Sequence, residues 1–168
     1  LVVTGASTYT GATNVQVGTI QDGVDNALPT GTTLTLGNGA ATAALDLNGH
    51  SQTLGGLAAN SGATATSVTN SSTTANGTLT YAGAGTSTFA GVIKEGTKKT
   101  ALAVTTGKLI LSGANTYSGG TAVSGGTLAT ASAGGTFGTG GIVVTNSGTV
   151  LELDNANSIA DNAPVNLG

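Results

Sequence analysis

The stretch 109-LILSGANTYSGGTAVSGGTLAT-130 decides the fold of this 168-residue chain. Three short runs of apolar or β-branched residues, Leu109–Leu111, Thr121–Val123 and Thr127–Ala129, are separated by clusters of Gly, Ser and Asn. Such clusters form turns, because glycine adopts positive φ easily and Asn and Ser side chains bond to the nearby backbone. The stretch therefore predicts strand, turn, strand, turn and strand, with no helical period.

The first residues of the chain repeat this stretch. Residues 1–22 align with residues 109–130 after a shift of 108 positions, and the alignment pairs Tyr9 with Tyr117. A weaker third copy, residues 79–91, has two extra residues and carries Phe89 in place of the tyrosine. Self-similarity of this kind indicates a repeat architecture, in which each unit buries its apolar face by stacking on its neighbours.

Residues 107–128 resemble the autotransporter-associated β-strand repeat, also called the passenger-associated transport repeat. The family pattern G-x-L-x-L-x-G-x-N-x-Y-x-G-G-T-x-V-x-x-G-T-L is matched by Gly107, Leu109, Leu111, Gly113, Asn115, Tyr117, Gly119–Gly120–Thr121, Val123 and Gly126–Thr127–Leu128. The N-terminal copy departs from its partner at Ser7, Ala12 and Val17. The resemblance implies a right-handed parallel β-helix in a secreted or surface-displayed bacterial protein, and it implies no enzymatic chemistry.

The composition limits the classes of partner. Charged residues make up 7% of the chain, the net charge is −3, and all four basic residues are lysines between positions 94 and 108. Binding of nucleic acid requires a basic face, so we expect no nucleic-acid partner. Hydrophobic residues at 38% are too frequent for a disordered chain. No apolar run is long enough to predict a membrane-spanning segment.

Cysteine and methionine are both absent. Without cysteine there are no disulfides, no Cys-ligated zinc, no iron–sulfur site and no thiol catalysis. The sequence shows no signal peptide and starts within a repeat. We therefore expect an excerpt or a processed piece of a longer exported polypeptide.

We predict an all-β fold, a single right-handed parallel β-helix over residues 1–168, with about seven turns of roughly twenty to twenty-five residues each. Residues 60–77, rich in Ser, Thr and Asn, are expected to form another turn of the helix with stacked Asn side chains. Residues 21–30 are a candidate for a short helical turn, and residues 94–99 for a solvated, hairpin-like loop that leaves the helix. The other expected strands include Thr33–Leu36, Ala44–Leu47, Ser51–Leu57, Thr78–Tyr81, Phe89–Ile93, Ala101–Val104, Ile142–Val144, Val150–Leu153 and Val165–Leu167.

Strand periodicity also predicts which side chains face the core. Side chains alternate between the two faces of a strand. The leucines of residues 45–47 and 151–153 should therefore fill the core, while Asp46 and Glu152 should face water. Because Tyr9 and Tyr117 hold equivalent positions, we expect both to cover a corner of the helix rather than to bind sugar.

Few residues could carry chemistry. Asp22 and Asp25 could ligate a cation, but clustered Asp and Asn usually form turns. His50, the single histidine, stands beside Gly49, and no GxSxG elbow is present. Asp46 and Glu152 would have to meet across turns to act as the carboxylate pair of a polysaccharide-cleaving enzyme. We expect no catalytic residue, no metal site and no cofactor.

Three functions remain open. The leading hypothesis is a non-enzymatic structural segment, a rod-like stalk or passenger, in the extracellular space or at the bacterial cell surface. A second is a self-assembling subunit of an extracellular filament, in which copies stack end to end because open strand edges template further pairing. A third is a β-helix that binds or cleaves carbohydrate, with host or surface glycans as partners.

Overall fold

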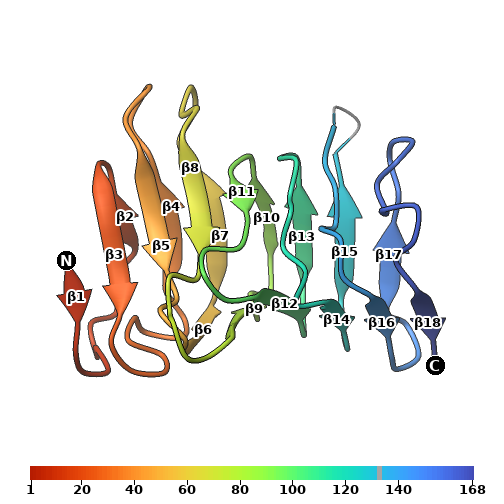
Figure 1. Ribbon diagram of the computed structural model, residues 1–168, viewed down its shortest axis with the longest axis horizontal. Coiled ribbons are helices and arrows are strands. Elements are labelled where there is room, and N and C mark those ends of the chain that lie inside the picture. Colours follow the sequence, from red (N-terminus) through yellow and green to blue (C-terminus); the bar gives the residue numbers. More distant parts are fainter. Residues whose placement is uncertain (132–133) are drawn as a thin grey trace.

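The computed structural model describes residues 1–131 and 134–168, and in this part of the chain every regular element is a β-strand. The strands stack into a β-solenoid of about seven turns, and all of their ladders are parallel. Figure 1 shows the turns in order from the N-terminus to the C-terminus along the longest axis. Among the described residues no helix could cross a membrane. The predicted all-β solenoid is confirmed.

Each turn has three sides. The first side contains β1 (Val2–Val3), β3 (Gly18–Asp22), β5 (Ala43–Asp46), β8 (Thr66–Thr69) and β11 (Val92–Ile93). The second side contains β6 (Ser51–Leu54), β9 (Gly77–Tyr81), β12 (Thr100–Val104), β14 (Thr121–Val123), β16 (Ile142–Val144) and β18 (Val165–Leu167). The third side contains β2 (Thr13–Val15), β4 (Thr33–Leu36) and β7 (Gly56–Ala59), followed by β10 (Thr86–Phe89), β13 (Lys108–Leu111), β15 (Thr127–Thr130) and β17 (Val150–Glu152).

The register of the ladders gives the length of one turn. It ranges from 19 residues, from Val2 to its partner Gln21, to 27 residues, from Ser51 to its partner Thr78. This variation shows that the three-sided cross-section is kept while the corners absorb extra residues.

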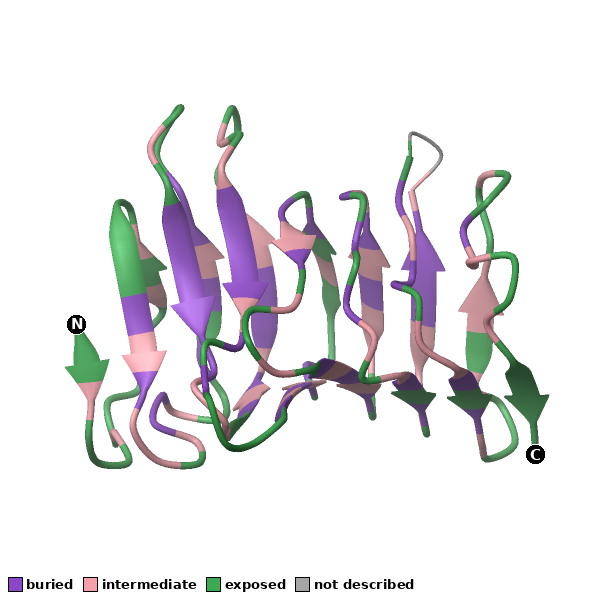
Figure 2. Cartoon of the chain, in the orientation of Figure 1, coloured by how far each residue is buried: buried purple, intermediate pink, exposed green. Residues whose placement is uncertain are grey.

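The interior is filled by side chains that point inward from all three sides. Aliphatic residues dominate, and four aromatic rings (Tyr81, Phe89, Tyr117 and Phe137) are at most 1% exposed. Figure 2 shows that the buried residues run through the middle turns, whereas β1 and β18 are largely exposed. Apolar burial of this kind, at about 25 cal/mol per Å², is the main stabilising contribution to a solenoid without disulfides.

A column of five glycines, Gly31, Gly55, Gly83, Gly107 and Gly126, occupies the corner before the third side. A Cβ atom at each of the last four would lie 2.0–2.5 Å from the carbonyl oxygen of the glycine one turn earlier. No side chain fits at such a distance, so the stacking of the turns requires glycine here. Only Gly107 (φ 63°) and Gly126 (φ 72°) also have positive φ.

Two local predictions are wrong. Residues 21–30 form the end of β3 and a turn, with Asn26 at φ 51°, rather than a helical turn. Residues 94–99 do not leave the solenoid, because the Lys98 N–H donates to Asn70 O at 3.3 Å and Lys99 O accepts from Gly77 N at 3.0 Å. The loop therefore follows the contour of the preceding turn.

Two side-chain predictions are also wrong. Leu153 is 52% exposed, because β17 ends at Glu152 and the chain turns away from the core. Asp46 is 4% exposed, because Ser71, Gln21 and Asn48 surround its carboxylate. Leu45 and Leu47 are buried as predicted.

The polar stretch at residues 60–77 forms a further turn that contains β8, as predicted, but its Asn side chains are used differently. Asn70 donates to Ala75 O at 3.1 Å and Lys99 O at 2.9 Å, and it accepts from Gly49 N at 2.7 Å. Asn70 thus bonds to the backbone, including that of adjacent turns. The predicted stack of Asn side chains does not hold this corner together.

The glycine column gives a first testable prediction. Gly83→Ala places a Cβ 2.0 Å from Gly55 O, so the backbone must shift and we expect a loss of about 2–3 kcal/mol in the free energy of unfolding. Gly85→Ala is the matched control, because no atom of the described residues lies within 4 Å of its Cβ. Urea unfolding followed by circular dichroism measures both. Equal stability of the two variants would contradict the role of the column.

Candidate functional site

Both aligned repeats make the same local contact. The Tyr117 hydroxyl bonds to Thr121 Oγ1 at 2.8 Å, and the Tyr9 hydroxyl bonds to Thr13 Oγ1. The spacing Tyr-x-x-x-Thr therefore has a structural cause, since it closes the irregular segment that leads into the next strand. Tyr117 is fully buried as expected, and burial raises its pKa, whereas Tyr9 is 43% exposed.

The two repeats occupy different sides of the solenoid. The first repeat begins with β1 on the first side, and its tyrosine precedes β2 on the third side. The second repeat begins with β13 on the third side, and its tyrosine precedes β14 on the second side. The shift of 108 positions from one repeat to the other therefore does not correspond to a whole number of turns.

Residues 79–91 are arranged differently from these repeats. Leu79 pairs with Leu102 on the second side, and Phe89 ends β10 and pairs with Leu111. Phe89 therefore lies within a strand, whereas Tyr117 precedes one.

Asn115 joins three successive turns. Its Oδ1 accepts from the Ile93 N–H at 2.7 Å, and its Nδ2 donates to Gly113 O at 2.9 Å and to Thr136 O at 2.7 Å. The residue is 4% exposed, so these bonds satisfy groups that water does not reach. The sequence marked Asn115 as a turn former. Its bridging role follows only from the stacking of the turns.

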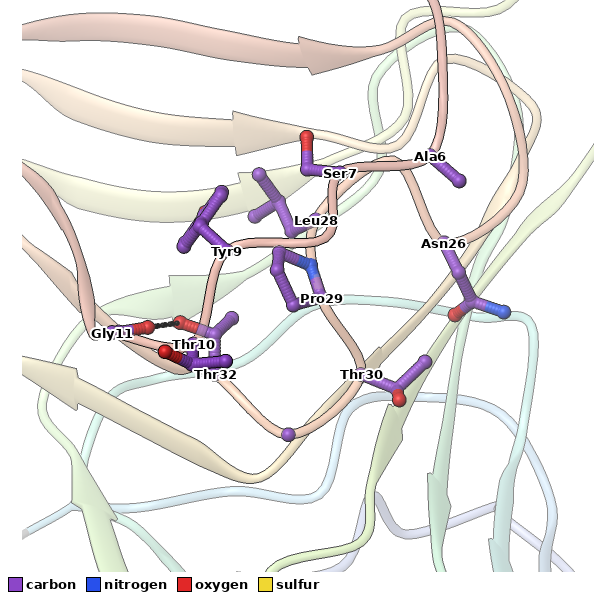
Figure 3. A pocket seen from close by; sticks show the side chains of 11 residues that line it. Ala6, Ser7, Tyr9, Thr10, Gly11, Asn26, Leu28, Pro29, Thr30 and Thr32 are labelled. Atoms are coloured by element: carbon purple, nitrogen blue, oxygen red, sulfur yellow. Dashed lines mark hydrogen bonds between the residues drawn. The ribbon is translucent and has the colours of Figure 1, made fainter.

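A groove of about 480 Å³ lies between the first two turns, beside Tyr9 (Figure 3). Leu28 and Pro29 supply apolar surface, and Thr30 and Asn26 supply polar groups. The Thr32 hydroxyl is already committed, because it donates to Gly11 O at 3.0 Å. The groove contains no charged side chain, so it offers shape and hydrogen bonds but no acid–base chemistry.

Asp46 and Glu152 do not meet, as the carbohydrate-cleaving alternative would require. Asp46 ends β5 on the first side, and Glu152 ends β17 on the third side, near the other end of the solenoid (Figure 1). Burial alone would raise the pKa of Asp46, but hydrogen bonds from Ser71, Gln21 and Asn48 lower it below its usual value. Glu152 pairs with Lys108 Nζ at 2.5 Å. Carbohydrate cleavage by this pair is therefore excluded.

The other titratable candidates form one partly exposed pair and one buried acid. His50 Nδ1 lies 3.4 Å from Asp25 Oδ1, which also accepts from the Ser51 N–H at 2.9 Å. Asp22 is buried, whereas Asp25 is exposed. Within residues 1–131 and 134–168, no group of three or more His, Cys, Asp or Glu side chains is arranged to hold a metal ion.

We expect Asn115→Ala to lower the free energy of unfolding by about 3 kcal/mol, because the Ile93 N–H and two carbonyl groups lose their partners in a buried place. Asn14→Ala, at an exposed position on β2, should change it by less than about 0.5 kcal/mol. Urea titration of both variants measures the difference. A small effect at Asn115 would show that water replaces the amide.

The tyrosines provide an internal comparison. Tyr117→Phe removes a buried hydroxyl from Thr121, and we expect a loss of about 1 kcal/mol in the free energy of unfolding. Tyr9→Phe removes the same contact where water can replace it, so its effect should be close to zero. Thermal unfolding of the two variants tests this order, and the reverse order would contradict it.

Comparison with known proteins agrees with the repeats seen in the structure. Residues 1–21 and 106–129 match the family model of the passenger-associated transport repeat. No curated protein and no solved structure gives a significant match to the chain. This chain is therefore a β-solenoid in which two segments, residues 1–21 in the first turn and residues 106–129, match the passenger-associated transport repeat.

Proposed function

We propose that the chain is a non-enzymatic structural segment of an exported bacterial passenger, which holds other parts of the polypeptide away from the cell surface. The observation that carries the proposal is the unbroken stacking of parallel turns from β1 to β18. The two matching repeats add support, because their family is named for passenger transport.

The geometry suits a stiff spacer more than a long one. Neighbouring parallel strands lie about 4.8 Å apart, so about seven turns add roughly 34 Å of length. The same 168 residues would span far more if they were extended, so length is exchanged for rigidity. Side chains from all three sides interlock in the core, and bending would separate turns that share hydrogen bonds.

The solenoid also suits export. Each turn contacts only the turns beside it, so folding can nucleate at one place and propagate along the chain. A polypeptide that emerges gradually can then fold turn by turn. The corner contacts at Gly83 and Asn115 are formed between adjacent turns. They would stabilise each new turn once it has packed on the turn before it.

End-to-end assembly with further copies is a second candidate. Along the described chain, the outer edges of β1 and β18 have no ladder partner, and Leu1 and Leu167 are 84% and 73% exposed. Further turns would pair with these edges, whether they come from the same polypeptide or from another copy. Sedimentation over a concentration series tests for copies, and an unchanging monomer would exclude them.

A display experiment tests the leading proposal. The chain is placed between an export signal and an outer-membrane anchor domain, with an epitope tag before residue 1. We expect the tag to reach the surface in intact cells, Gly83→Ala to lower the displayed fraction several-fold, and Gly85→Ala to leave it unchanged. Retention of the unaltered chain inside the cell would contradict the proposal.

A further inference from the structure

Asp22 holds an unusual position at the end of β3. It pairs with Val3 of β1, and the register of β3 with β5 places Leu47 on its other side. Ile20, two residues earlier, packs in the core, so Asp22 points to the same inner face, whereas Gln21 points outward and bonds to Asp46. A carboxyl group therefore lies against the apolar core, with its residue 0% exposed.

Among the described residues, neither carboxyl oxygen of Asp22 has a hydrogen-bond partner. Two polar residues at equivalent positions are neutral and hydrogen-bonded. Asn70, in the same column two turns later, makes hydrogen bonds with Ala75 O, Lys99 O and Gly49 N. Thr130, which takes the place of Asp22 in the second repeat, bonds to Ser158 Oγ at 2.9 Å. The acid is thus peculiar to the first repeat.

The charged groups around Asp22 do not stabilise its ionised form. Asp46, at the end of β5, contributes a negative charge. Asp25, in the loop directly after β3, contributes another and is itself paired with His50. On the β1 side, the amino group of Leu1 donates to Thr19 O at 2.9 Å, three residues before Asp22. Burial, together with Asp46 and Asp25, raises the pKa of Asp22 to about 7.

Separation of β1 from β3 would expose the Asp22 carboxyl group to water. We define the first seam as three backbone hydrogen bonds, in which Ser7 N, Gln21 N and Gly23 N donate to Ala27 O, Leu1 O and Val3 O at 2.8–3.0 Å. Strand β1 has only two residues and covers Asp22 through Val3. A carboxylate there is desolvated, and separation of β1 from β3 restores its water.

We propose that Asp22 is a proton-controlled latch of the first seam, which closes the seam when its carboxyl is protonated and releases it when the carboxyl is ionised. The sign follows from linkage. The closed seam binds a proton more tightly than the open one, because the closed-state pKa lies above the ordinary value of 3.8. The closed form is therefore fully favoured below about pH 4, loses stability as the pH rises towards 7, and changes little beyond that.

Amide hydrogen exchange, expressed as protection factors, tests the latch on the intact chain. We expect the protection of Gly23 to fall about tenfold from about pH 5 to about pH 6 and to level off above about pH 7. Ala131 is the internal control, because its N–H donates to Leu111 O at 2.9 Å at the equivalent place in the second repeat. Its protection should not follow this profile.

Two variants complete the test. Asp22→Asn and Asp22→Thr place the residues of the column and of the second repeat at this position, and both should give high, pH-independent protection at Gly23. Asp25→Asn should keep the pH profile, with its midpoint moved to lower pH. A flat profile in the unaltered chain, or a profile that survives in Asp22→Asn, would overturn the proposal. Closure of the seam by added Ca²⁺ above neutral pH would overturn it as well, in favour of a cation site.

Discussion

The close stacking of turns is the constraint on which the structure depends. Parallel strands must approach to about 4.8 Å for their backbone groups to bond, and this spacing holds at the corners as well as along the sides. At the corner before the third side, a glycine in each of four successive turns meets the carbonyl group of the glycine in the turn before it. The high glycine content, 29 of 168 residues, is in large part the consequence of this spacing.

Corners without regular strands need another source of hydrogen bonds. Side-chain amides provide it, because one amide can both donate and accept. Gln52 bonds to the N–H and the carbonyl group of Leu28, where the second side has no strand in the early turns. Asn115 likewise accepts from the Ile93 N–H and donates to Thr136 O, where the described residues form no strand on the first side of the later turns. The ladders of the three sides are thereby continued through irregular segments, and a chain with few charges keeps its buried backbone satisfied.

The architecture could be predicted from the sequence, because alternation and turn chemistry are local. Thr33–Leu36 was predicted to the residue, and the 108-residue shift between repeats indicated a repeat architecture. The resemblance of residues 107–128 to the passenger-associated transport repeat implied the β-helix itself. The predictions of side-chain burial that were wrong concerned positions whose surroundings depend on neighbouring turns or on where a strand ends. The burial of Asp46 comes from Ser71 in the next turn, and the exposure of Leu153 comes from the end of β17.

Prediction of the candidate sites from the sequence was limited in the same way. Asp22 could be noted as one acid among several, but its isolation in the core follows from a register with Val3 and Leu47 that no local pattern contains. The bridging of Asn115 likewise depends on residues of the two adjacent turns, Ile93 and Thr136. The sequence thus predicts which residues form a corner. Their hydrogen-bond partners depend on the number of residues in each preceding turn, which the sequence does not show directly.

The displacement of the two repeats around the axis has a consequence for recognition. Surface features that the repeats share point in different directions, since one repeat begins on the first side and the other on the third. A rigid bivalent ligand, such as an antibody approaching from one direction, could engage only one of the two copies. Avidity requires that both sites be reached at once. Sequence repetition in this solenoid therefore supplies stacking units without presenting a repeated epitope along any one face.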